Sequence, residues 1–146
     1  MDLPRLQIPP ALQRRMAYPK FRDAAPRMFV LRGEYWLDVA CIRAAASLGW
    51  TVAEVPVRLE GGMPRQALAE LFTRLAEFKP DFILSINMGG MDERGLMARF
   101  FADLALPYAV WFVDDPRTIL MDRTWYGSEY ALAFSWERAY LPYLER

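Results

Sequence analysis

The sequence predicts an α/β domain with three layers and a mostly parallel five-stranded sheet. Five short apolar runs alternate with segments of helical periodicity along the chain. Most connections between successive runs are long enough to hold a helix, so right-handed crossovers between parallel strands are expected. Two of the runs end in turns of polar residues and glycine, as strands do at the ligand-binding edge of an open α/β sheet. The expected strand order, 2-1-3-4-5, is that of a Rossmann-like domain of the flavodoxin type.

The strands are expected where apolar, β-branched and aromatic residues cluster between turn signals. They cover residues 27–31, 50–57, 82–86, 108–113 and 130–134. Apolar residues recur at helical spacing between these strands. Helices are therefore expected over residues 35–48, 64–78 and about 96–104, with a short helix near the C-terminus. In the first of them one stripe holds Leu37, Cys41, Ala44, Ala45 and Leu48, and Gly49 is placed as the C-terminal cap.

Residues 1–26 form a proline-rich, basic N-terminal arm with five prolines and a possible short helix over 11–16. The first 27 residues contain six basic and two acidic residues, a net charge of +4, which leaves −4 on the remainder of this neutral chain. The arm either packs on its own domain, residues 27–146, or docks onto a partner or an anionic surface. The acidic body argues against nucleic acid as a partner.

Composition excludes several kinds of chemistry. The chain has no histidine and one cysteine, Cys41, so a Ser-His-Asp triad, an internal disulfide and a cysteine-rich zinc site are excluded. The first turn offers Gly33 alone, without the glycine fingerprint of a dinucleotide site. We expect no metal and no cofactor, and catalysis must depend on carboxylates or on groups supplied from elsewhere. No apolar run reaches the roughly 20 residues of a membrane span, and no secretory segment is evident, so we expect a cytoplasmic protein.

Two turns are expected to line a shared crevice with Gly33 and Glu34. The first turn contains Asn87, Met88, Gly89 and Gly90. Its glycines allow positive φ, and the helix that begins near it, capped by Asp92, has N–H groups that could hold an anion or a sugar hydroxyl. A tight turn without a ligand explains the same residues.

The second turn contains Asp114 and Asp115 before Pro116. Adjacent side chains of an extended chain point to opposite faces, so the two carboxylates do not form a metal pair. Asp115 is expected to cap a helix that starts at the proline. Asp114 either faces the crevice, where burial would make it more basic, or is a surface charge at a strand end. Trp111 in the preceding strand is either a platform for a sugar ring or an aromatic packed against the sheet.

The segments Lys79–Asn87, Leu106–Pro116 and Phe134–Tyr140 resemble a bacterial glycosyltransferase-like family related to spore maturation proteins. The run Trp-Phe-Val-Asp-Asp-Pro is the most specific part of the resemblance. The resemblance implies that this chain is the N-terminal, acceptor-side domain of a two-domain GT-B glycosyltransferase. Such an enzyme transfers a sugar from a nucleotide-sugar to a glycan or protein acceptor. Asp114 and Glu34 would then act as base or hydrogen-bonding groups, and residues 87–90 would form the cleft wall.

The chain ends at Arg146, where the C-terminal, nucleotide-sugar-binding domain of such an enzyme would begin. The resemblance therefore implies a domain that lacks its donor-binding partner and is inactive by itself. The uncovered surface of such a half could form a homodimer. The alternative is a stand-alone flavodoxin-like module for ligand binding or regulation.

Overall fold

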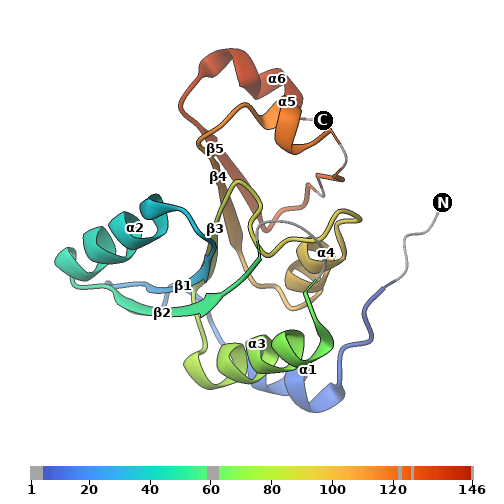
Figure 1. Ribbon diagram of the computed structural model, residues 1–146. Helices are drawn as coiled ribbons and strands as arrows, with labels where there is room; N and C mark the ends of the chain where they lie inside the picture. Colours follow the sequence, from blue (N-terminus) through green and yellow to red (C-terminus); the bar gives the residue numbers. More distant parts are fainter. Residues whose placement is uncertain (1–4, 59–62, 122, 126, 146) are drawn as a thin grey trace.

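Five parallel strands form one sheet in the order β2-β1-β3-β4-β5, which confirms the predicted fold class and strand order. The computed structural model describes residues 5–58, 63–121, 123–125 and 127–145 (Figure 1). The strands are β1 (Arg27–Arg32), β2 (Thr51–Pro56), β3 (Phe82–Ile86), β4 (Tyr108–Phe112) and β5 (Ala131–Ser135). The helices are α1 (Pro10–Met16), α2 (Trp36–Ser47), α3 (Arg65–Phe78), α4 (Leu96–Asp103), α5 (Pro116–Ile119) and α6 (Leu141–Leu144), with the 3₁₀ turn η1 (Arg138–Tyr140) before α6.

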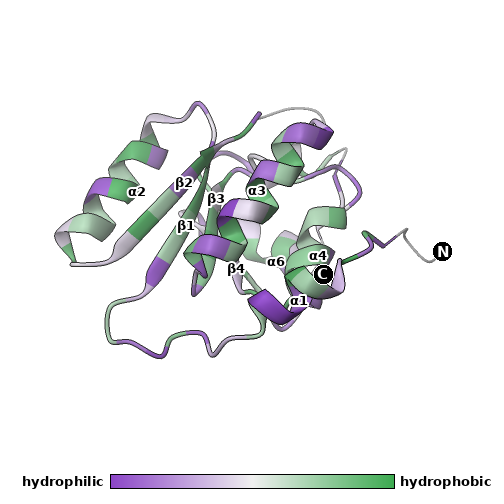
Figure 2. Cartoon of the chain, turned by 90° about the horizontal axis from the view of Figure 1, so that it is seen from below, coloured by the Kyte–Doolittle hydropathy of each residue, from purple (hydrophilic) through white to green (hydrophobic). Residues whose placement is uncertain are grey.

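The two faces of the sheet are covered unequally. Figures 1 and 2 show α2 alone on one side, with α1, α3 and α4 on the other. The side chains of β1 alternate between these two faces, because successive side chains of a strand point to opposite faces. Phe29 and Leu31 belong to the main core, whereas Met28 and Val30 pack with Ala45 of α2 in a smaller cluster.

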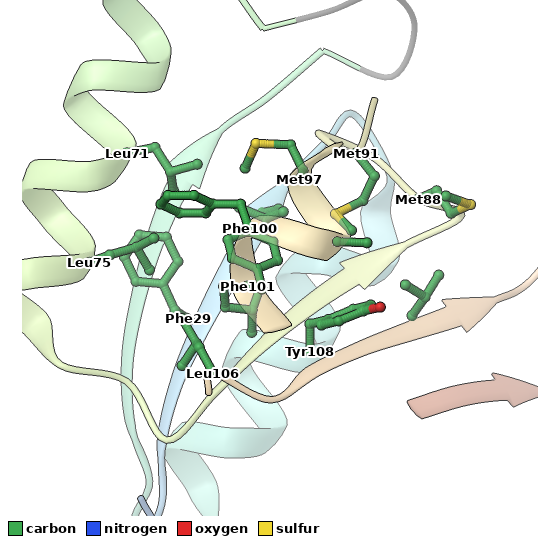
Figure 3. Packing of buried hydrophobic residues seen from close by; sticks show 14 of the residues in the cluster. Phe29, Leu71, Leu75, Met88, Met91, Met97, Phe100, Phe101, Leu106 and Tyr108 are labelled. Carbon is green, nitrogen blue, oxygen red and sulfur yellow. The ribbon is translucent and has the colours of Figure 1, made fainter. Parts of the chain in front are cut away.

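The main core lies between the sheet and the helices α3 and α4. In Figure 3, Leu71 and Leu75 of α3 and Phe100 of α4 meet above Phe29 of β1. The stacked rings of Phe72 and Phe100, 4.4 Å apart, join the two helices. This packing fixes α4, and with it the turn that leads into α4 from β3.

The apolar stripe predicted for α2 is only partly buried. Ala45 is buried and Cys41 is half-buried, but Ala44 is exposed and Leu48 is 66% exposed. The reason is that α2 packs mainly on β1 and β2, at one end of the strand order, so its other sides have little to pack against. Cys41 is therefore less buried than a core residue would be, although burial raises the pKa of its thiol.

The N-terminal arm packs on its own domain over the residues described from Arg5 onward. Met16 of α1 is fully buried in the main core. The Tyr18 hydroxyl donates to the carbonyl oxygen of Pro80, and the Asp81 carboxylate accepts from the N–H groups of Phe21 and Arg27 at 2.6 and 2.7 Å. The arm thus packs against the main core and is hydrogen-bonded to the residues that precede β3. No helix in the described part of the chain is long and apolar enough to cross a membrane.

Candidate functional site

The carboxyl ends of β1, β3 and β4 meet at one edge of the sheet, as the sequence predicts. Ile86 of β3 lies beside Trp111 of β4, and Leu31 of β1 lies beside Ser85 of β3. Strand order reverses between β1 and β3, which is where open α/β sheets bind ligands. The chain segments that leave this edge carry Gly33, Glu34, Asn87 and Asp114.

Asn87 ties the end of β3 to the end of β4. Its Nδ2 donates to Oδ2 of Asp114 at 2.6 Å, and its Oδ1 accepts from the backbone N–H groups of Val113 and Asp114 at 2.9 and 3.3 Å. Its own backbone N–H donates to the carbonyl oxygen of Trp111 at 3.0 Å. Asn87 is buried, so its amide serves to position Asp114.

Asp114 is exposed at the strand end, as one of the two alternatives for this side chain expected, and it is not buried as the other required. The carboxylate is nevertheless held in one orientation by the amide of Asn87. An exposed carboxylate with a fixed orientation can accept a hydrogen bond from a ligand hydroxyl. This pair is the strongest polar feature of the edge.

Two of the turn residues after β3 do not line the crevice as predicted. Met88 is 1% exposed and belongs to the main core, where Figure 3 places it beside Met91. Gly89 is buried, and its carbonyl oxygen accepts from the Ser85 hydroxyl at 2.8 Å. Gly90 is half-buried and faces Val57, whose Cγ1 would lie 2.9 Å from a Cβ at this position, and it lines a hollow of about 320 Å³ beyond the end of β2. Met88 and Gly89 therefore shape the turn from inside, whereas Gly90 borders a hollow at this edge.

Of the two explanations for the turn before α4, the one without an anion fits the structure better. The Asp92 carboxylate accepts from the backbone N–H groups of Arg94, Leu96 and Met97 at 2.7 to 3.0 Å. Asp92 thus acts as the predicted cap, and it occupies the N–H groups that an anion would need.

Asp115 caps α5 as predicted. Its Oδ1 accepts from the backbone N–H of Arg117 at 2.9 Å, and the Arg117 guanidinium forms an ion pair with the same carboxylate. These hydrogen bonds from Arg117 lower the pKa of Asp115. The Asp115 carboxylate is therefore engaged by Arg117 of the helix that it caps.

Asp38, in the first turn of α2, is a buried carboxylate near this edge that was not predicted from the sequence. Glu34 is exposed and Gly33 is half-buried at the edge, whereas Asp38 in the first turn of α2 is 1% exposed. Burial raises the pKa of Asp38, opposed by the nearby N–H groups of Tyr35 and Gly33. Neither carboxylate oxygen has a hydrogen bond of ordinary geometry within the described residues. The sequence did offer a signal for this residue, because Asp38 is the one acidic residue of α2 and lies among apolar neighbours in its first turn.

The side chains of the two tryptophans differ in their relation to the Asn87–Asp114 pair. Trp111 is half-buried on the face of the sheet that α2 leaves open, where it lines a hollow with Leu84 and Phe134. Trp136 is 65% exposed, and its Nε1 donates to the carbonyl oxygen of Val113 at 3.1 Å. Across the described ranges, no three His, Cys, Asp or Glu side chains are grouped so that they could hold a metal ion.

No protein-family model, curated protein or solved structure matches the chain.

Proposed function

We propose that this chain is the acceptor-side domain of a glycosyltransferase-like protein, with the acceptor bound at the carboxyl edge of the sheet. The observation that carries the proposal is the contact of 2.6 Å between Asn87 Nδ2 and Asp114 Oδ2. It orients an exposed carboxylate next to the point where strand order reverses.

In the reaction proposed, an acceptor hydroxyl donates to Asp114 and attacks the anomeric carbon of a nucleotide-sugar. The bond from that carbon to the diphosphate breaks, the nucleoside diphosphate leaves, and the hydroxyl proton passes to the carboxylate. Glu34 on the neighbouring loop supplies a second carboxylate for hydrogen bonding. The donor would be bound by a separate, nucleotide-sugar-binding domain.

The alternative, a flavodoxin-like cofactor module, is less well supported. Such a module would hold a phosphate on free N–H groups at the start of a helix. At α4 the N–H groups of Leu96 and Met97 are occupied by Asp92. The first turn has Gly33 without further glycines.

A glycan array and nucleotide titrations test the proposal. We expect the chain to bind a subset of glycans, and Asp114→Asn to weaken that binding about tenfold, the scale of one charged hydrogen bond. Asp103→Asn, at the exposed end of α4, is the matched control and should bind as the unsubstituted chain does.

FMN, UDP-glucose and GDP-mannose should bind poorly. Micromolar binding of FMN would favour the flavodoxin-like alternative. Glycan binding that Asp114→Asn leaves unchanged would contradict the proposed role of this edge.

A further inference from the structure

The face of the sheet beside α2 is apolar and open over β3, β4 and β5. Phe82, Leu84, Ala109, Trp111, Leu132 and Phe134 line two neighbouring hollows on it, of about 430 and 530 Å³. Leu132 and Phe134 of β5 are 54% and 48% exposed. Parallel sheets are normally covered by helices on both faces. Here the described helices leave this part of one face bare, as Figure 1 shows.

The outer side of α2 is apolar as well. Among its twelve residues the ionisable groups are the buried Asp38, the thiol of Cys41 and the exposed Arg43. Trp36 and Val39 are 75% and 41% exposed. A helix that is apolar on all sides is usually buried on all sides, so α2 also lacks a covering surface.

We propose that a second copy of this chain covers both surfaces in a two-fold symmetric dimer. A two-fold axis parallel to the strands, above the boundary of β1 and β3, turns the open face of one copy toward the same face of the other. It places α2 of each copy on β3 and β4 of its partner, with β5 of the partner along the outer side of the helix. Each α2 is then sandwiched between two sheets, and the same residues are used by both copies, as in an isologous interface.

The dimensions of the two surfaces agree. The twelve residues of α2 extend about 18 Å and the five residues of β5 about 17 Å. The side of α2 that faces the hollow carries Cys41 and Ala44, which are small enough for the two helices to lie side by side.

The exposed apolar area is sufficient for a dimer. Six large apolar side chains of α2, β5 and the arm beside them are between 41% and 75% exposed: Phe21, Trp36, Val39, Leu48, Leu132 and Phe134. At about 100 Å² each they offer on the order of 600 Å² per copy, at the lower end of the roughly 600–1,000 Å² per partner of a standard interface. The hollows are lined by one charged residue, Glu129, opposite in sign to Arg43 of α2.

Sedimentation velocity with paired charge substitutions tests the dimer. Val39 near the start of α2 and Phe134 near the end of β5 face each other across the proposed interface. We expect the unsubstituted chain to dimerise at micromolar concentration, and Val39→Glu and Phe134→Lys each to weaken the dimer at least tenfold. An equimolar mixture of the two variants should form a heterodimer, because one contact becomes an ion pair and the other is unchanged.

Gln66→Glu and Thr73→Lys, exposed on α3 at the opposite face, are the matched controls and should remain dimeric. Leu48→Glu and Leu132→Lys form a second pair if circular dichroism shows that a first variant is unfolded. A monomer at all concentrations up to about 200 µM, beyond the range of most specific interfaces, would overturn the proposal. A dimer that resists both substitutions, or variants whose mixture stays monomeric, would overturn it equally.

Discussion

Asn87 combines an uncommon backbone conformation with a buried side chain at the centre of the candidate site. Its φ is 49°, in the left-handed region that asparagine adopts more readily than most residues other than glycine. Its amide bridges to the end of β4 through Val113 and Asp114. The position therefore favours asparagine both for its conformation and for the one donor and one acceptor of its side chain.

Asn87→Ala should lower the free energy of unfolding by about 1–2 kcal/mol, because the half-buried N–H of Val113 loses its acceptor. Asn87→Asp should retain the acceptor but place a second carboxylate against Asp114. Its destabilisation should therefore shrink as pH falls and one carboxyl becomes protonated. Urea denaturation at pH 7 and pH 4 measures both effects. A loss below 0.5 kcal/mol for Asn87→Ala would show that the bridge is not needed.

Asp38 gives the chain a pH dependence of known sign. Burial raises its pKa in the folded state above the ordinary value of 3.8, so the folded chain binds this proton more tightly than the unfolded chain. Its favourable contribution to stability is complete below pH 3.8 and is lost as pH rises through the raised pKa. The free energy of unfolding should therefore fall as pH rises through the raised pKa of Asp38.

Asp38→Asn should raise the free energy of unfolding at pH 7 by about 1 kcal/mol, since the amide oxygen can still face the N–H groups of Gly33 and Tyr35 without a charge. The gain should vanish below pH 3.8, where the carboxyl is protonated in both states. Thermal denaturation across this pH range measures the difference. A loss of stability at pH 7 would mean that the charge is needed as a cap.

At the scale of elements, two glycines with the same conformation have different surroundings. Gly90, in the turn after β3, and Gly49, after α2, have φ values of 76° and 78°. A Cβ at Gly90 would lie 2.9 Å from Val57 Cγ1, whereas a Cβ at Gly49 would meet nothing within 4 Å. Both positions require glycine for its backbone, but Gly90 also allows the close approach of two loops.

Gly49→Ala should therefore cost about 1 kcal/mol, the conformational penalty alone. Gly90→Ala should cost about 1–3 kcal/mol more, because the added methyl group clashes with Val57. The double variant Val57→Ala/Gly90→Ala should recover part of this difference. Equal costs for the two single variants, measured by chemical denaturation, would contradict the close approach.

The elements were more predictable than the turns between them. Apolar runs and long connections sufficed for the strand order, and the predicted third strand, 82–86, coincides with β3. In the turn that follows, glycine was expected to supply positive φ, yet Asn87 and Met88 adopt it as well as Gly90. The burial of Met88 in the core holds this conformation, and tertiary packing of that kind has no signal in the local sequence.

At the scale of the whole molecule, coverage of the sheet could not be read from the strands. Leu132 and Phe134 are apolar residues of a parallel strand, and such residues look the same in sequence whether a helix covers them or not. The partly exposed stripe of α2 has the same cause. By contrast, the position of Asn87 and Asp114 at the same edge of the sheet was predictable, because it follows from the parallel order of β3 and β4 alone.

The arm is an integral part of the fold, because α1 packs against α3 and inserts Met16 into the core. Met16→Ala should lower the global free energy of unfolding by about 2–4 kcal/mol, the usual cost of a cavity left by a fully buried methionine. Gln13→Ala, exposed on the same helix, should change it by less than about 0.5 kcal/mol.

Hydrogen exchange of Met16→Ala distinguishes the two ways in which this stability can be lost. If the arm unfolds together with the sheet, amides of β1 and β3 should lose protection along with those of α1. Protection lost in α1 alone, with an unchanged global transition, would mean that the arm detaches independently and that the sheet is stable without it.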